Sequence, residues 1–218
     1  MVESIIPFIP ALFKGLLLTL FYFALGAVGS IVLALPVSVG MGSSSRLIRF
    51  PVIAYVEFFR NTPLLVQLFW LHYALPVLTG IKTTAPQTAA LAIVVVMTAY
   101  MAEVYRAGLD AVGRGQHEAG LALGLKPFQR WRLIIIPQAF PIALPAIGNT
   151  LVSLLKATAI LSILSVPELM RTTSRISDYT ANPITFYSLA AVVYIALCML
   201  LSFALDRLEA RVSRWRVG

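Results

Sequence analysis

Ionisable and amide side chains interrupt an otherwise apolar sequence at a few positions, and these are the candidates for chemistry. Lys156 lies midway along an apolar stretch, with Ser153 one turn and Asn149 two turns earlier on a similar helix face. Charged groups inside a membrane are costly and are usually functional, so this face suits a polar translocation path. The Lys156 ammonium would suit a substrate carboxylate there. Alternatively, Lys156 pairs with Glu103 or Glu57 and only joins helices, and both interpretations stay open.

A second polar group precedes a proline. Glu57 and Arg60 are three residues apart, close enough to pair on one helix face. Pro63 denies the carbonyl of Phe59 its usual donor and disfavours helical geometry in the residue before it, which predicts a kink or break. The break could border a transport path, together with Gln67, or form an elbow at the membrane surface before a span that starts at Pro63. We favour the elbow.

Two further ionisable groups have ordinary explanations. Glu103 is followed three residues later by Arg106, which predicts a local ion pair near the headgroups. His72 is flanked by Trp70 and Tyr73, a composition typical of aromatic packing at the membrane interface. Neither group is expected to contact a ligand.

No combination of residues suggests catalysis or a bound metal or cofactor. His117 and Glu118 lack the second histidine of a zinc-binding H-E-x-x-H motif, and no glycine-rich phosphate loop is present. The chain has two histidines and a single cysteine, Cys198. We therefore expect that the chain does not hydrolyse ATP itself and binds no metal.

Composition indicates what must position these residues. Of the 218 residues, 59% are hydrophobic and only 12% charged, which is typical of a membrane protein. Apolar runs of about 20 residues, long enough to cross a bilayer as helices, recur along the chain. The predicted fold is an all-α integral membrane protein with five transmembrane helices in a single domain. The spans are expected at about 16–39, 63–79, 88–105, 143–166 and 186–205.

The distribution of positive charge predicts the orientation. With the N-terminus outside and the C-terminus in the cytoplasm, the inner segments hold eleven of the seventeen lysines and arginines and the outer segments four. Because the basic residues punctuate apolar runs instead of covering one face, the net charge of +8 does not indicate nucleic acid binding. This orientation puts the loop at about 107–137 in the cytoplasm.

The stretch RGQHEAGLALGLKPFQRW, residues 114–131, is predicted to hold a short helix within that loop. Residues 116–123 favour a helix, Glu118 is expected in its first turn, and Gly124 is a candidate for the residue that ends it. Pro127 suits the first position of a second helix, and Pro137, Pro141 and Pro145 should distort the entry to the next span. A helix this short needs a surface to pack on, either membrane lipid or a soluble partner.

The same stretch resembles the EAA loop of bacterial ABC-importer permeases. The pattern of EAA, three residues, G, nine residues and I-x-L-P matches Glu118-Ala119-Gly120, Gly124 and Ile134 to Pro137, with Gly120 and Ile136 as departures. The segments at 60–67 (R-x-T-P-L-L-x-Q) and 99–108 (A-Y-x-A-E-x-x-R-A-G) extend the resemblance to the polar amino acid subgroup. One departure lies in the fourth span, where the subgroup commonly has Asp, Thr and Ser after the lysine and this chain has Ala157, Thr158 and Ala159.

The resemblance implies a division of labour. A coupling helix would insert into a cytoplasmic ATPase that binds ATP and magnesium, a second permease copy or paralogue would complete the pathway, and an extracytoplasmic solute-binding protein would deliver a polar amino acid or related compound to the outer loop at 167–183. The resemblance also implies that the protein is located in the bacterial inner membrane. The residues so assigned to ATPase coupling are Arg114, Glu118, Ala119, Gly120, Leu121, Leu123, Gly124 and Lys126. Those assigned to the substrate path are Asn149, Ser153, Lys156, Glu57, Arg60 and Gln67.

Two other kinds of membrane protein would have a similar composition. An ion-driven secondary transporter usually contains internal repeats, and none is apparent here. A structural membrane subunit of an enzyme complex could use Lys156 and Glu103 for assembly or proton transfer. Neither alternative explains the spacing of the EAA pattern.

Overall fold

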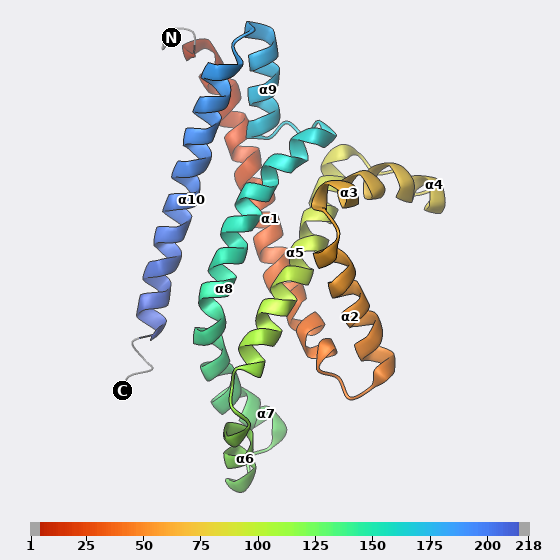
Figure 1. The fold of residues 1–218 in the computed structure, drawn as a ribbon, viewed down its shortest axis with the longest axis vertical. Helices are drawn as coiled ribbons and strands as arrows, with labels where there is room; N and C mark the ends of the chain where they lie inside the picture. The colour runs from red at the N-terminus through yellow and green to blue at the C-terminus, as the bar shows by residue number, and fades with distance from the viewer. Residues whose placement is uncertain (1–4, 214–218) are drawn as a thin grey trace.

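The computed structural model describes residues 5–213, and every regular element in that range is helical. Four helices are long and apolar enough to cross a membrane, and a fifth span is possible if two shorter helices joined by a sharp bend count as one. The four long helices are α1 (Ile9–Met41), α5 (Ala85–Asp110), α8 (Ile136–Ala157) and α10 (Pro183–Ser213). Figure 1 shows them as an elongated bundle with α10 along one side and α2 along the other.

Each long helix extends beyond the apolar run from which it was predicted. A short 3-10 turn, Ile6–Phe8, leads into α1, and a 3-10 segment, Thr158–Leu164, continues α8. The start of α5 is fixed by a capping box, in which the Thr84 side chain accepts from the Gln87 amide and the Gln87 side chain accepts from the Thr84 amide. Apolar length alone does not reveal these ends, because the helices continue into their polar flanks.

Small residues let the central helices pack closely. A Cβ added to Gly29 of α1 would lie 2.9 Å from Cγ1 of Val94 in α5. A Cβ on Gly108 of α5 would lie 2.7 Å from the Cβ of Ala143 in α8 and 3.2 Å from the carbonyl oxygen of Ala139. Close approach of backbones at glycine and alanine is the usual basis of helix packing in membranes. The central helix α5 is thereby held between α1 and α8.

The second apolar segment is broken, as Pro63 predicted. The helix α2 (Arg46–Asn61) ends at Thr62, which is extended, and the chain turns by 110° into α3 (Leu64–Phe69) and α4 (Leu75–Thr79). Figure 1 shows α3 and α4 leaving the bundle sideways. The helix α2 packs against α5 at the side of the bundle: Val56 is fully buried, and the Tyr55 hydroxyl donates to the Val95 carbonyl, near the middle of α5, at 2.6 Å. By length and composition the bent pair is either a broken span or a re-entrant loop.

Prolines leave wider helical turns in two places. The amide of Leu75 donates to Trp70 and the amide of Ile136 donates to Trp131, so that each bond spans five residues and forms a π turn. Pro76 and Pro137 follow directly, and neither can donate to the carbonyl four residues earlier. Pro141 and Pro145 then lie within α8, which continues through them.

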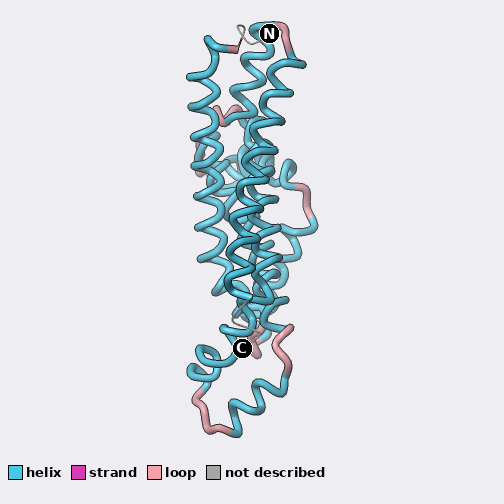
Figure 2. Tube along the Cα trace, turned by 90° about the vertical axis from the view of Figure 1, so that its left-hand side faces the viewer, coloured by secondary structure: helices cyan, strands magenta, loops and turns pink. Residues whose placement is uncertain are grey.

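Three short helices complete the chain. The helices α6 (Arg114–Ala122) and α7 (Pro127–Arg130) connect α5 to α8, and α9 (Leu169–Thr180) connects α8 to α10. Figures 1 and 2 show α6 and α7 projecting beyond one end of the bundle, while α9 lies at the opposite end near the start of α1.

Candidate functional site

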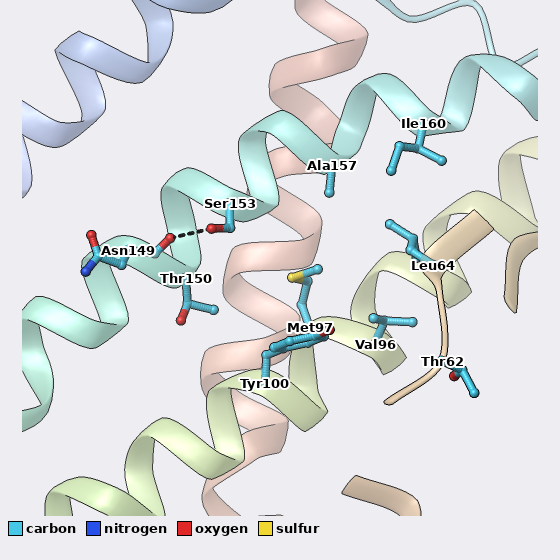
Figure 3. Close-up of a pocket in the computed structure, with 10 residues that line it drawn as sticks. All are labelled: Thr62, Leu64, Val96, Met97, Tyr100, Asn149, Thr150, Ser153, Ala157 and Ile160. Atoms are coloured by element: carbon cyan, nitrogen blue, oxygen red, sulfur yellow. Dashed lines mark hydrogen bonds between the residues drawn. The ribbon is translucent and has the colours of Figure 1, made fainter. Parts of the chain in front are cut away.

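A cavity of about 390 Å³ lies where α5, α8 and the break after α2 meet. Figure 3 shows α8 and α5 as its opposing walls. Two of the predicted path residues, Asn149 and Ser153, line it. The other polar lining residues, which the sequence did not single out, are Thr62, Tyr100 and Thr150. The apolar part of the lining consists of Leu64, Val96, Met97, Ala157 and Ile160.

The hydroxyl groups of this cavity are bound to backbone carbonyls. Ser153 donates to Asn149 and Thr150 donates to Ala146, each at 2.8 Å. Thr62 donates to Phe58 at 2.7 Å. The Tyr100 hydroxyl donates to the carbonyl of Arg60 at 3.3 Å. Each hydroxyl has one hydrogen, so what these groups retain for a ligand is their capacity to accept, and the Thr62 oxygen already accepts from the Gln67 side chain.

Lys156 is exposed and does not belong to the lining of the cavity. Among residues 5–213 it forms no ion pair, because its two expected partners are engaged elsewhere. Glu57 accepts from the Asn61 side chain at 2.7 Å, and Glu103 is bound by arginines. The structure therefore contradicts the pairing of Lys156 with Glu103 or Glu57.

Glu103 is the centre of a small ion-pair cluster. Arg106 Nε donates to Glu103 Oε2 at 3.1 Å, which confirms the predicted local pair, and Arg106 Nη1 also lies 2.6 Å from Asp110 Oδ2. Arg60 Nη1 of α2 lies 3.6 Å from Glu103 Oε2. The predicted Glu57–Arg60 pair is thus wrong, because α2 packs on α5 and brings Arg60 to Glu103 instead.

Gln67 connects the two sides of the break. Its side-chain amide donates to the carbonyl oxygens of Phe59 at 3.0 Å and Thr62 at 2.9 Å, which have no helical donors beyond the end of α2. Gln67 is 4% exposed and is absent from the lining of the cavity. The structure gives this candidate path residue a role in fixing the bend.

The helix α6 presents apolar side chains away from the bundle. Leu121 is 61% and Leu123 74% exposed, and Glu118 and Ala119 are also exposed. Gly120 alone in this helix is buried, and a Cβ there would lie 3.0 Å from both Cγ and Cδ of Arg130. The remaining members of the predicted coupling set are also exposed: Arg114 begins α6, and Lys126 directly precedes α7.

The ends of α6 agree only in part with the prediction. Gly124 ends the helix as expected, with a φ of 70°. Its amide donates to Leu121 and that of Leu125 to Gly120, the pair of bonds that defines a Schellman motif. Pro127 begins α7, also as expected. However, α6 begins at Arg114, so Glu118 lies in the second turn and not in the first, because Gly113 supplies the N-cap.

One buried carboxyl was missed by the sequence analysis. Glu168, at the N-cap of α9, is 0% exposed and accepts from the amides of Met170 and Arg171 at 2.8 and 2.7 Å. It also accepts from Tyr194 at 3.0 Å and from Thr19 at 3.4 Å. Burial raises the pKa of this carboxyl above its ordinary value, against the effect of the hydrogen bonds. The only signal in the sequence is a glutamate directly before a helix, which does not reveal burial.

Comparisons with known proteins agree with this arrangement. Residues 34–214 match the family described as binding-protein-dependent transport system inner membrane component. A protein of Sinorhizobium fredii named "Probable amino-acid ABC transporter permease protein" is 38% identical over 197 residues, covering 90% of this chain and 85% of that protein. The glutamine transport system permease protein of Escherichia coli is 32% identical over 212 residues, covering 97% of each.

Solved structures give the same result for the fold. The crystal structure of an amino acid ABC transporter with histidines aligns with a TM-score of 0.90 at 32% identity, over 96% of this chain and 97% of that one. An inward-facing methionine ABC transporter aligns with a TM-score of 0.81 at 24% identity, over 94% of this chain and 98% of that one, and shows the fold alone. The chain belongs to the binding-protein-dependent inner membrane components, as the multi-pass permease of an amino-acid ABC importer that binds no cofactor itself and leaves ATP hydrolysis to a separate ATPase subunit.

Proposed function

We propose that α6 is the element through which the ATPase subunit moves this permease. The observation that carries the proposal is the exposure of Leu121 and Leu123 on a helix that projects beyond the bundle and is closed by Gly124. Exposed leucines at the end of a membrane protein are costly in water and suit an apolar groove on a soluble partner. Arg114 and Lys126 would contact the rim of that groove.

The proposed orientation puts α6 and α7 in the cytoplasm, with the N-terminus outside and the C-terminus inside. The charge distribution supports it, and it leaves α9 on the outer side, where the helix would face the solute-binding protein. Single cysteines in a Cys198→Ser background test it with a membrane-impermeant reagent. Tyr179→Cys, at a position that is 84% exposed, should react in intact cells, whereas Ser44→Cys should react only after permeabilisation. The reverse pattern would refute the orientation.

The cavity lined by Asn149 and Ser153 is the proposed place at which a polar amino acid crosses the membrane. Its polar groups lie between two long apolar helices, and Asn149 and Ser153 are exposed and open to a solute. A second copy or a paralogue of this chain would close the pathway. The exposed side chains of Val77 (84%) and Leu78 (72%), on the part that leaves the bundle sideways, support such a partner.

Reconstitution with the ATPase tests the proposed coupling. Leu123→Asp should lose ATPase co-purification and ATP-driven amino acid uptake while membrane insertion is unchanged. Leu208→Asp is the matched control, because Leu208 is also exposed (44%) but lies on α10. Full uptake by the Leu123 variant, or equal loss in the control, would contradict the proposal.

A further inference from the structure

An apolar groove of about 330 Å³ lies on the face of α8 that points away from the cavity lined by Asn149. Phe140 lines the groove and Asn149 follows nine residues later, about two and a half helical turns, so the two side chains leave α8 on opposite sides. The ends of α1 and α5 form the other walls, which include Leu35 and Tyr105. No described residue lines both cavities, so the groove is separate from the proposed substrate pathway.

The groove offers a ligand little except apolar surface. Its only hydroxyls among the described residues belong to Ser38 and Tyr105, and each donates to a carbonyl of α1. Along α8 the lining extends from Ile136 to Ile147, a rise of about 16 Å at 1.5 Å per residue. One leaflet of the hydrocarbon core is about 15 Å deep, half of the usual bilayer core. The groove is therefore about as long as one leaflet is deep.

At one end the groove opens into a polar cavity of about 680 Å³, which is its mouth. Val39, Leu109 and Trp131 line both, so the two are continuous. The mouth lies at the level of the lipid headgroups, because α5 has 26 residues, about 39 Å, and its last turn extends beyond a hydrocarbon core of about 30 Å. Trp131 suits this level, since tryptophan is enriched at the membrane interface.

The mouth carries one charge of each sign. Apart from His117, the ionisable residues among its described lining are Arg106 and Asp110. Arg106 has five N–H groups, and its bonds to Glu103 and Asp110 use three of them. Asp110 accepts that bond through Oδ2 and accepts no other within residues 5–213, and its side chain is 64% exposed. The mouth thus retains donors for an anion beside an acceptor for a cation.

A phospholipid is an occupant whose parts match both cavities at these depths. Burial of its chain in the groove selects no particular lipid, because the chain leaves a bilayer that is equally apolar. Selection therefore depends on the headgroup in the mouth. A phosphate accepts from Arg106, and a primary ammonium donates to Asp110. A quaternary ammonium has no N–H for that carboxylate, and a glycerol headgroup brings a net negative charge near it.

We propose that the groove and its mouth bind a zwitterionic aminophospholipid, phosphatidylethanolamine, with one acyl chain along α8 and the headgroup between Arg106 and Asp110. The proposal goes beyond the proposed function, because it requires neither the orientation of the chain nor the coupling role of α6. A bound lipid would contact three successive parts of the chain, since Arg106 of α5, His117 of α6 and Trp131 before α8 line the same mouth.

Native mass spectrometry of the purified complex of permease and ATPase measures which lipid the complex retains. The complex, in detergent, is equilibrated with equal amounts of phosphatidylethanolamine, phosphatidylcholine and phosphatidylglycerol that carry identical acyl chains. Phosphatidylethanolamine should be retained at least about fivefold more than either of the others, because it alone brings both a phosphate and an N–H cation to the mouth.

One pair of variants tests the headgroup contact. Asp110→Asn should reduce the preference for phosphatidylethanolamine over phosphatidylcholine by about fivefold, because the charged acceptor for the ammonium is lost. Asp206→Asn is the matched control, since it removes an exposed carboxylate of α10 that lines neither the groove nor the mouth. The preference should be unchanged in this control.

A second pair tests the position of the chain. Val39→Trp puts a large ring at a position that is 62% exposed and lines both cavities, so it should lower the retention of phosphatidylethanolamine to that of phosphatidylcholine. Val32→Trp is the matched control, because Val32 lies seven residues earlier on a similar face of α1, is 56% exposed and lines neither cavity.

Three results would overturn the proposal. The first is equal retention of the three lipids by the unmodified complex, or an undiminished preference in Asp110→Asn. The second is an equal loss of preference in either control variant. The third is a Val39→Trp complex whose permease pair separates while its bound lipid is unchanged, because a second copy of the chain would then cover the groove.

Discussion

The side-chain nitrogen of Gln67 lies 3.0 Å from the carbonyl oxygen of Phe59, and this bond crosses a bend of 110° between two helices. The same nitrogen also donates to Thr62. One buried amide therefore compensates for the donors that α2 loses where Pro63 ends it.

Replacing Gln67 by leucine should destabilise the protein by about 1–3 kcal/mol, because two partly buried carbonyl groups lose their hydrogen-bond donor. The midpoint of thermal unfolding of the purified complex measures this change. Gln138→Leu is the control, since the Gln138 side chain bonds only to Gln116 at an exposed position. An equal effect of both substitutions would contradict the assigned role of Gln67.

Gly108→Ala should destabilise the crossing of α5 and α8. The added Cβ would lie 2.7 Å from that of Ala143, closer than two carbon atoms can approach without a backbone shift. Overpacking of this kind typically costs about 1–3 kcal/mol. Gly148→Ala should be tolerated, because its Cβ would meet Leu205 at an ordinary 3.6 Å. The midpoint of thermal unfolding should therefore be lower for Gly108→Ala than for Gly148→Ala.

Gly124→Ala should weaken the end of α6 by about 1–2 kcal/mol, because Gly124 has a φ of 70° and an L side chain is strained there. No atom lies within 4 Å of the added Cβ, so the effect would be conformational and not steric. Gly115→Ala is the control within the same helix: its Cβ also meets nothing, and alanine favours helix. ATPase co-purification should fall only for the Gly124 variant. The same loss for Gly115→Ala would show that backbone strain at position 124 is not the cause.

The raised pKa of Glu168 predicts a pH dependence of stability. Because the folded state binds the proton more tightly than the unfolded chain, this contribution is complete below the unfolded pKa of about 4.3 and is lost as the pH rises through the folded pKa. Glu168→Gln, which cannot titrate, should remove this fall from the thermal midpoint measured between pH 4 and 8. Asp178→Asn, on the exposed side of α9, should leave it in place. An unchanged profile in the Glu168 variant would refute the assignment.

Features that depend on one residue and its chain neighbours were predictable from the sequence. Pro63 breaks the second segment because it has no amide hydrogen, and Gly124 ends α6 because it adopts a positive φ. Pro127 begins α7 because its ring fixes φ at a helical value. It was also predictable that Asn149 and Ser153 share one face of α8, where both line the cavity, because they are four residues apart.

Features that depend on how helices cross were not predictable in this way. Arg60 binds Glu103 and not Glu57 because α2 lies against α5, and Tyr100 joins the cavity for the same reason. The burial of Glu168 requires Thr19 and Tyr194, which are far away in the sequence. One local expectation is also wrong: Glu118 lies in the second turn of α6, because Gly113 starts the helix at Arg114.

The three prolines near the start of α8 have a mechanical consequence. Pro137, Pro141 and Pro145 recur every four residues, so the carbonyls of Leu133, Pro137 and Pro141 each lack the usual amide donor four residues later in the chain. This part of α8 therefore resists bending less than the part that follows. Under the proposed coupling, a displacement of α6 and α7 would be taken up first as curvature in this more flexible part of α8. It would then reach Asn149 as a graded bend and not as the tilt of a rigid helix.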